Sequence, residues 1–94
     1  MKNNTNKKEE SYGKIIYAVQ VVALKKYVSL SVLKEMYAID KLLFIEKDRD
    51  FYEYLVGYFF SFKEASEYRK TLNQPDAFVV SYINGKRLES IFRK

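Results

Sequence analysis

The order of strand-like and helix-like segments constrains the fold of this chain more than any other feature of its sequence. Four runs rich in β-branched and aromatic residues predict strands over 15–24, 42–47, 51–59 and 77–83. Two segments with apolar residues at helical spacing predict helices, one over 28–37 and one from Ser61 to about Asn73. A capping box, Ser61 followed three residues later by Glu64, marks the start of the second helix. The predicted order is therefore βαββαβ.

This order predicts an α+β fold of the ferredoxin-like or RNP-like sandwich type. In such a fold a four-stranded antiparallel sheet carries both helices on one face. The chain has 94 residues, which is room for one domain with one core. We assign residues 14–88 to this domain. Residues 1–13 are polar and charged and are assigned to a disordered linker, and residues 89–94 to a C-terminal tail.

The sheet face that the helices leave open is the candidate binding surface. Strand side chains alternate between the two faces, and we expect the bulkier apolar sets to pack on the helices. The open face is then predicted to carry Gln20, Phe51, Glu53, Leu55, Val79 and Ser81. An exposed apolar patch on a small domain usually marks a binding surface. The alternative is that the tail, through Ile91 and Phe92, covers this face.

Several classes of chemistry are excluded by composition. The chain has no His and no Cys, which removes Cys/His zinc sites, disulfides and His-based acid-base catalysis. Its three glycines are isolated, so no phosphate-binding loop is possible. The carboxylates of Asp48, Asp50 and Glu53 lie in or beside a turn and are interpreted as solvated charges, not as a glycosidase pair. We expect a binding protein without a cofactor, not an enzyme.

Several segments, taken together and in order, resemble the SPOR domain of bacterial envelope proteins. The family's first strand commonly follows Y-x-V-Q-V-G-x-F, and its third Y-R-V-R-V-G-P-F before a helix that opens S-x-E-E-A. The matching segments here are YAVQVVAL (17–24), YEYLVGYF (52–59) and SFKEA (61–65). The end of the chain, DAFVVSYINGKRL (76–88), is similar to the form found in Bacteroidetes members. Val22 and Ala23 depart from the family pattern.

The resemblance implies a function without catalysis. SPOR domains bind peptidoglycan glycan strands, preferably free of stem peptides, and target a parent protein to the cell wall or division site. The family's binding positions carry over to Gln20 and Phe51. Its basic position after the aromatic carries over to Glu53, a reversal of charge, so Lys47 or Arg49 is the nearby candidate for the missing cation. Other envelope or division proteins are further expected partners.

Charge and hydropathy bear on where such a domain acts. The net charge of +5 favours anionic partners. No run of about 18 apolar residues exists, so no membrane-spanning segment is expected. The first ten residues lack the apolar stretch of a signal peptide. The resemblance therefore implies the periplasm or cell envelope only if the domain belongs to a longer exported protein.

Two other functions compete with glycan binding. A protein-interaction domain would use the same apolar sheet face, with Val22, Leu55 and Val79 as its contacts. An RNA-binding domain of the RRM type has the same βαββαβ order and sheet-face aromatics. Residues 51–59 lack the third-strand signature of that family, and Glu53 would repel phosphate. No nucleic-acid partner is therefore expected.

Overall fold

The computed structural model of the chain describes residues 14–88. Its elements are β1 (Ile15–Leu24), α2 (Leu30–Tyr37), β2 (Leu43–Asp48), β3 (Phe51–Phe59), α3 (Phe62–Thr71), β4 (Phe78–Ile83) and β5 (Lys86–Arg87). The first six come in the predicted order, and β5 follows them. The tail residues Ile91 and Phe92, predicted as a possible cover for the sheet, lie outside the described residues.

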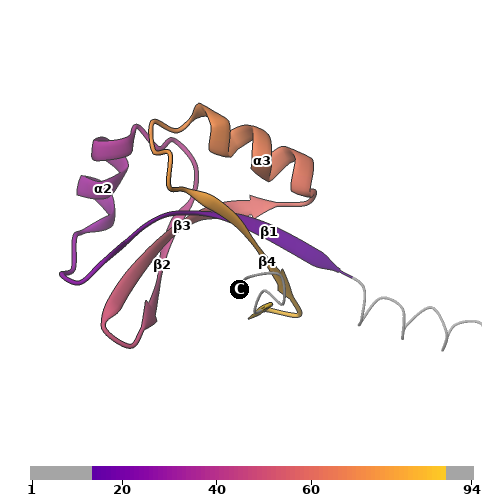
Figure 1. The fold of residues 1–94 in the computed structure, drawn as a ribbon, viewed down its shortest axis with the longest axis horizontal. Coiled ribbons are helices and arrows are strands. Elements are labelled where there is room, and N and C mark those ends of the chain that lie inside the picture. Colours follow the sequence, from indigo (N-terminus) through magenta and orange to yellow (C-terminus); the bar gives the residue numbers. More distant parts are fainter. Residues whose placement is uncertain (1–13, 89–94) are drawn as a thin grey trace, which may run out of the picture.

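The sheet corrects the predicted fold class. Five antiparallel strands, in the order β2-β3-β1-β4-β5, form a curled half-barrel (Figure 1). The four-stranded ferredoxin-like or RNP-like sheet is therefore wrong for this chain. The physical reason is the turn at Asn84 and Gly85, whose φ angles of 52° and 80° are both positive. Such a two-residue turn reverses the chain, so the residues after it run antiparallel to β4. Arg87 then pairs with Tyr82 and belongs to β5.

A hydrogen bond between two strands that are not neighbours shows how strongly the sheet curls. The Tyr82 hydroxyl on β4 donates to Glu46 Oε2 on β2 at 2.7 Å, although β1 and β3 lie between these strands. In a flat sheet three strand spacings would separate them by about 14 Å. The strands are also closely apposed at Gly57, where an added Cβ would lie 3.2 Å from the Cβ of Ala18. The sheet face that carries Glu46 and Tyr82 is thus concave.

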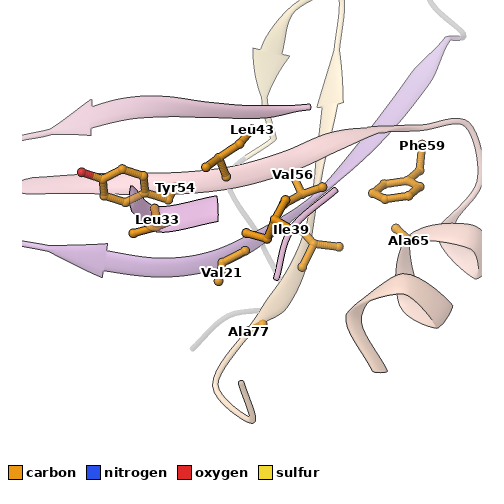
Figure 2. Close-up of a cluster of buried hydrophobic side chains, with 10 residues drawn as sticks. Val21, Leu33, Ile39, Leu43, Tyr54, Val56, Phe59, Ala65 and Ala77 are labelled. Carbon is orange, nitrogen blue, oxygen red and sulfur yellow. The ribbon is translucent and has the colours of Figure 1, made fainter. Parts of the chain in front are cut away.

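Both helices cover the other, convex face of the sheet (Figure 1). The main core fills the space beneath them and is shown in Figure 2. Its buried members are Val19, Val21, Leu33, Ile39, Leu43, Tyr54, Val56, Phe59, Ala65 and Ala77. Each helix contributes one buried residue, Leu33 from α2 and Ala65 from α3. Tyr37 of α2 and Tyr68 of α3 are partly buried against the same core and add to this contact.

Side-chain caps explain where the helices begin. Ser29 Oγ accepts a hydrogen bond from the Val32 amide at 3.3 Å, at the start of α2. Ser61 Oγ accepts one from the Glu64 amide at 3.1 Å, which confirms the predicted start of α3. The Glu64 carboxylate accepts in return from the amide of Phe60, at 3.3 Å. The two serine bonds satisfy amides of the first helical turn that have no backbone partner, and the Glu64 bond holds the residue that precedes the cap.

Tyr54 joins the sheet to the segment that leads into α2. Its side chain is fully buried, and its hydroxyl accepts from the Val28 amide and donates to the Val28 carbonyl, both at 2.7 Å. We expect Tyr54→Phe to lower the free energy of unfolding by about 2 kcal/mol, because both backbone groups lose their partner. Urea unfolding measures this. Tyr27→Phe, at a ring that is 59% exposed, is the matched control and should change it little. Equal effects of the two would contradict the role given to the Tyr54 hydroxyl.

Candidate binding site on the concave sheet face

A second apolar cluster lines the concave face of the sheet. Ala18, Leu55, Val80 and Tyr82 are buried in it, with Phe44 packed against them. The Tyr58 ring adds to this cluster, with its centre 5.1 Å from that of Phe44 and 6.1 Å from that of Tyr82. Leu55 has no exposed surface. The face therefore presents no open apolar floor of the kind that the sequence predicted.

A chain of polar side chains lies across the same face. Arg87 Nη1 donates to Glu53 Oε1 at 2.7 Å and to Glu46 Oε1 at 3.5 Å. Arg87 Nη2 donates to Gln20 Oε1 at 2.8 Å. The Tyr82 hydroxyl completes the chain through its bond to Glu46. Together these four partners and Arg87 form the polar network, which joins β1, β2, β3, β4 and β5.

The electrostatics of the polar network explain why Arg87 lies where it does. Glu46 and Glu53 are directly opposite each other on β2 and β3. Like charges in that position are unfavourable unless a cation lies between them. Arg87 supplies the cation, and its side chain is only 20% exposed, against 13% for Glu53. Burial, together with the hydrogen bond to Glu46, raises the pKa of Tyr82 far above its usual value, so its hydroxyl stays a donor.

Three partly exposed aromatic side chains share the concave face with the polar network. Phe78 lies directly opposite Gln20 in the pairing of β4 with β1. Phe51 is two residues before Glu53 on β3, so its side chain is on the same side of the sheet. Tyr58 reaches this face through its contacts with Phe44 and Tyr82. Between 37% and 49% of each of these three residues is exposed, so each ring offers apolar surface beside polar groups.

The structure brings together some of the predicted site residues and separates others. Gln20, Phe51, Glu53 and Leu55 all lie on the concave face, as predicted. The predicted placement of Val79 and Ser81 there is wrong. Val79 is opposite Val19 and packs against the main core under the helices, and Ser81 is opposite Tyr17, which packs there too.

The error on β4 has a physical cause. We assigned the bulkier set of side chains to the helical face, but the bulkier set, Phe78, Val80 and Tyr82, fills the concave face instead. Curling brings the outer strands together, and large side chains are needed to fill the space between them on the concave face.

On β1 a shift in register between Gln20 and Val22 also places Val22 against the main core. Gln74 Nε2 donates to the Val21 carbonyl at this irregularity, at 3.2 Å.

Neither of the two basic residues proposed to replace the missing cation reaches Glu53. The Lys47 ammonium lies 5.2 Å from the centre of the Tyr52 ring, which packs against the main core, and also donates to the Arg49 carbonyl. Arg49 is exposed in the β2–β3 turn with a φ of 56°. The cation beside Glu53 is Arg87, which comes 34 positions later in the sequence.

Sequence reasoning missed five residues of this site, which are Glu46, Tyr58, Phe78, Tyr82 and Arg87. The signal for Arg87 was present in Asn84-Gly85, because a two-residue turn pairs the residues on either side in fixed register. Counting outward from that turn places Arg87 opposite Tyr82, as observed. Counting outward from Arg49 and Asp50 in the same way places Glu46 opposite Glu53. No local feature of the sequence shows that the Tyr82–Arg87 pair and the Glu46–Glu53 pair come into contact.

Comparison with known proteins adds no identification. A comparison with protein-family models, curated proteins and solved structures finds no match. The resemblance to SPOR domains therefore stays a prediction from the sequence. Within residues 14–88 no helix is long and apolar enough to cross a membrane. In the same part of the chain, no group of three or more carboxylates is placed to hold a metal ion.

Proposed function

We propose that the protein is a non-catalytic binding domain whose concave sheet face receives a glycan strand, with stem-peptide-free peptidoglycan as the first candidate. The observation that carries this proposal is the row formed by Gln20, Arg87 and Glu53, three planar polar side chains joined by hydrogen bonds of 2.7 and 2.8 Å. Partly exposed aromatic rings share the face with that row. Ligand sites commonly combine apolar and aromatic walls with a few placed polar groups.

The polar network matches the chemistry of sugar hydroxyls, each of which donates one hydrogen bond and accepts others. Guanidinium groups only donate, carboxylates only accept, and the Gln20 amide does both. The Arg87 and Glu53 side chains are 20% and 13% exposed, so they retain N–H groups and lone pairs for a ligand, whereas Gln20 is buried, with 7% of its surface exposed, and mainly orients Arg87. Their mutual bonds fix their orientation before a ligand arrives, which lowers the entropy lost on binding. The aromatic rings supply the apolar surface that sugar C–H groups contact.

The competing protein-interaction function loses its main support. It depended on an exposed apolar sheet face made by Val22, Leu55 and Val79. Val22 and Val79 pack under the helices instead, and Leu55 is fully buried. A polar ligand therefore fits the concave face better than an apolar protein surface does.

The test is sedimentation of the protein with purified peptidoglycan sacculi, with and without amidase treatment to remove stem peptides. We expect binding to rise after amidase treatment. The double variant Tyr58→Ala/Phe78→Ala removes two rings of the concave face and should weaken binding at least tenfold, roughly 1.4 kcal/mol. Thermal unfolding of the variant establishes that it is folded at the temperature of the assay.

The matched control is Met36→Ala/Phe62→Ala, which removes two exposed apolar side chains, one from α2 and one from α3. Both helices lie on the convex side of the sheet (Figure 1), and Phe62 contacts Tyr17, whose ring packs there, so this pair lies away from the concave face. We expect the control to bind as the wild type does. The glycan proposal fails if the folded wild type does not sediment, or if both double variants lose binding equally. A concentration-dependent molecular mass would then favour the protein-interaction function.

A further inference from the structure

Basic and aromatic side chains alternate at one end of the sheet, where the loop after β1 meets the β2–β3 hairpin. The Lys25 ammonium lies 5.9 Å from the centre of the Phe51 ring, and the Lys47 ammonium 5.2 Å from that of Tyr52. The Tyr27 ring meets Tyr52 edge to face at 5.7 Å. The two segments lie together because β1 and β3 are antiparallel neighbours (Figure 1). We call this end the hairpin tip, defined by residues 25–27 and 47–52.

Unlike Arg87, the cations of the hairpin tip have no anionic partner among the residues that the structure describes. Among residues 14–88, no carboxylate oxygen lies within 4.0 Å of a charged nitrogen of Lys25, Lys26, Lys47 or Arg49. Asp48 and Asp50 in the turn leave the tip with four positive charges against two negative ones. Tyr27 is 59% exposed and Phe51 is 40% exposed. The tip thus offers unpaired positive charge beside exposed aromatic surface.

We propose that the hairpin tip docks onto an anionic lipid bilayer. Lysine ammonium groups are attracted to anionic headgroups. The rings of Tyr and Phe favour the boundary between the headgroups and the acyl chains of a bilayer. Lys25 and Lys47 are exposed residues, so their ammonium groups, which lie over the rings, remain open to an anionic headgroup. The proposal shares the Phe51 ring with the candidate glycan face but does not depend on glycan binding, because the polar network, Tyr58 and Phe78 play no part in it.

A nucleic acid would also be attracted to these cations, but the geometry favours lipid. Single-stranded nucleic acids bind by stacking bases on open aromatic faces. Here the Lys25 ammonium lies over Phe51 and that of Lys47 over Tyr52, so Tyr27 alone of the three tip rings has no ammonium over it, and one ring cannot stack the successive bases of a strand. A headgroup phosphate needs only the ammonium groups and leaves the rings where they are.

The expected attraction is weak, reversible and sensitive to salt. One lysine or arginine close to an anionic bilayer raises partitioning about fivefold. Two net positive charges therefore correspond to roughly 25-fold tighter binding to an anionic than to a neutral bilayer. At an ionic strength near 1 M the screening length falls to about 3 Å, and this preference should disappear.

The experiment is co-sedimentation of the full chain with two kinds of vesicle. One is pure phosphatidylcholine, and the other is an equimolar mixture of phosphatidylcholine and phosphatidylglycerol. We expect binding to the mixed vesicles only, lost at high salt. Lys25→Gln/Lys47→Gln should reduce it about 25-fold. The control Lys63→Gln/Lys70→Gln removes the same charge from exposed positions of α3 and should stay within about twofold of wild type.

Two further measurements keep the proposal open to refutation. Because Lys47 also bonds the Arg49 carbonyl, Lys25→Gln/Lys26→Gln provides a second variant that leaves the turn intact and should show a similar loss. A single-stranded oligonucleotide is titrated in parallel. The membrane proposal is overturned if mixed vesicles bind no better than neutral ones, or if the α3 control loses as much as the tip variants. Binding of the oligonucleotide alone, lost in the tip variants, would overturn it in favour of a nucleic-acid site.

Discussion

Replacing Leu33 by alanine is expected to lower the free energy of unfolding by about 3 kcal/mol, within the range for deleting a fully buried leucine side chain. Leu33 has no exposed surface and is the only buried residue of α2. A helix of eight residues is not stable alone, so α2 depends on this contact and on the Tyr54–Val28 bonds. For a domain of this size, a loss of this amount lowers the melting temperature by roughly 15 °C.

The change in stability is measured by urea and thermal unfolding. Val32→Ala is the matched control, since Val32 is the preceding residue of α2 and is 48% exposed. It should change the free energy of unfolding by about 0.5 kcal/mol or less, as exposed sites usually do. If Leu33→Ala is no more destabilising than Val32→Ala, α2 is not anchored as the structure shows.

Replacing Arg87 by alanine is expected to lower the free energy of unfolding by about 2 kcal/mol. Removing one partner of a buried ion pair leaves a charge without compensation, which costs roughly 3–5 kcal/mol when burial is complete. The side chains here retain exposures of 20% for Arg87, 13% for Glu53 and 33% for Glu46, so we expect less than that. The two opposed carboxylates would also repel each other once the guanidinium is gone.

The origin of this effect can be isolated with a double-mutant cycle. Glu53→Gln removes the carboxylate closest to Arg87, and in the Arg87→Ala background it should restore part of the lost stability. We expect a coupling of about 1–2 kcal/mol, typical of residues in one ion-pair network. Lys86→Ala changes the exposed neighbour on β5 and serves as the control. A coupling near zero, or equal effects at positions 86 and 87, would show that the polar network does not stabilise the fold.

The sequence by itself determined most of the local structure. β-branched and aromatic runs produced the four predicted strands, and their bounds differ from those observed by one residue at most. Ser61 and Glu64 set the start of α3 through bonds between neighbouring residues. These features follow from the sequence because the interactions that fix them act within one turn or one strand.

The sequence alone predicted only in part which face of the sheet each strand side chain lies on. Phe51, Glu53 and Leu55 were placed correctly because alternation along β3 is regular there, and Gln20 because it precedes the register shift on β1. Val79 was not, because both faces of β4 are apolar and local pattern does not distinguish them. Pairing of β4 with β1 decides this, and pairing is a tertiary property.

Only the tertiary structure decided the character of the candidate site. Arg87 bonds to Gln20, 67 positions away, and to Glu53, 34 positions away. These contacts form because β5 extends the sheet and the whole sheet curls, which carries an edge residue over its centre. Curling results from the sum of twist and packing over all strands, so no short segment encodes it. The sequence therefore provided the amide, the carboxylate and the guanidinium, and the curvature of the sheet brought them together.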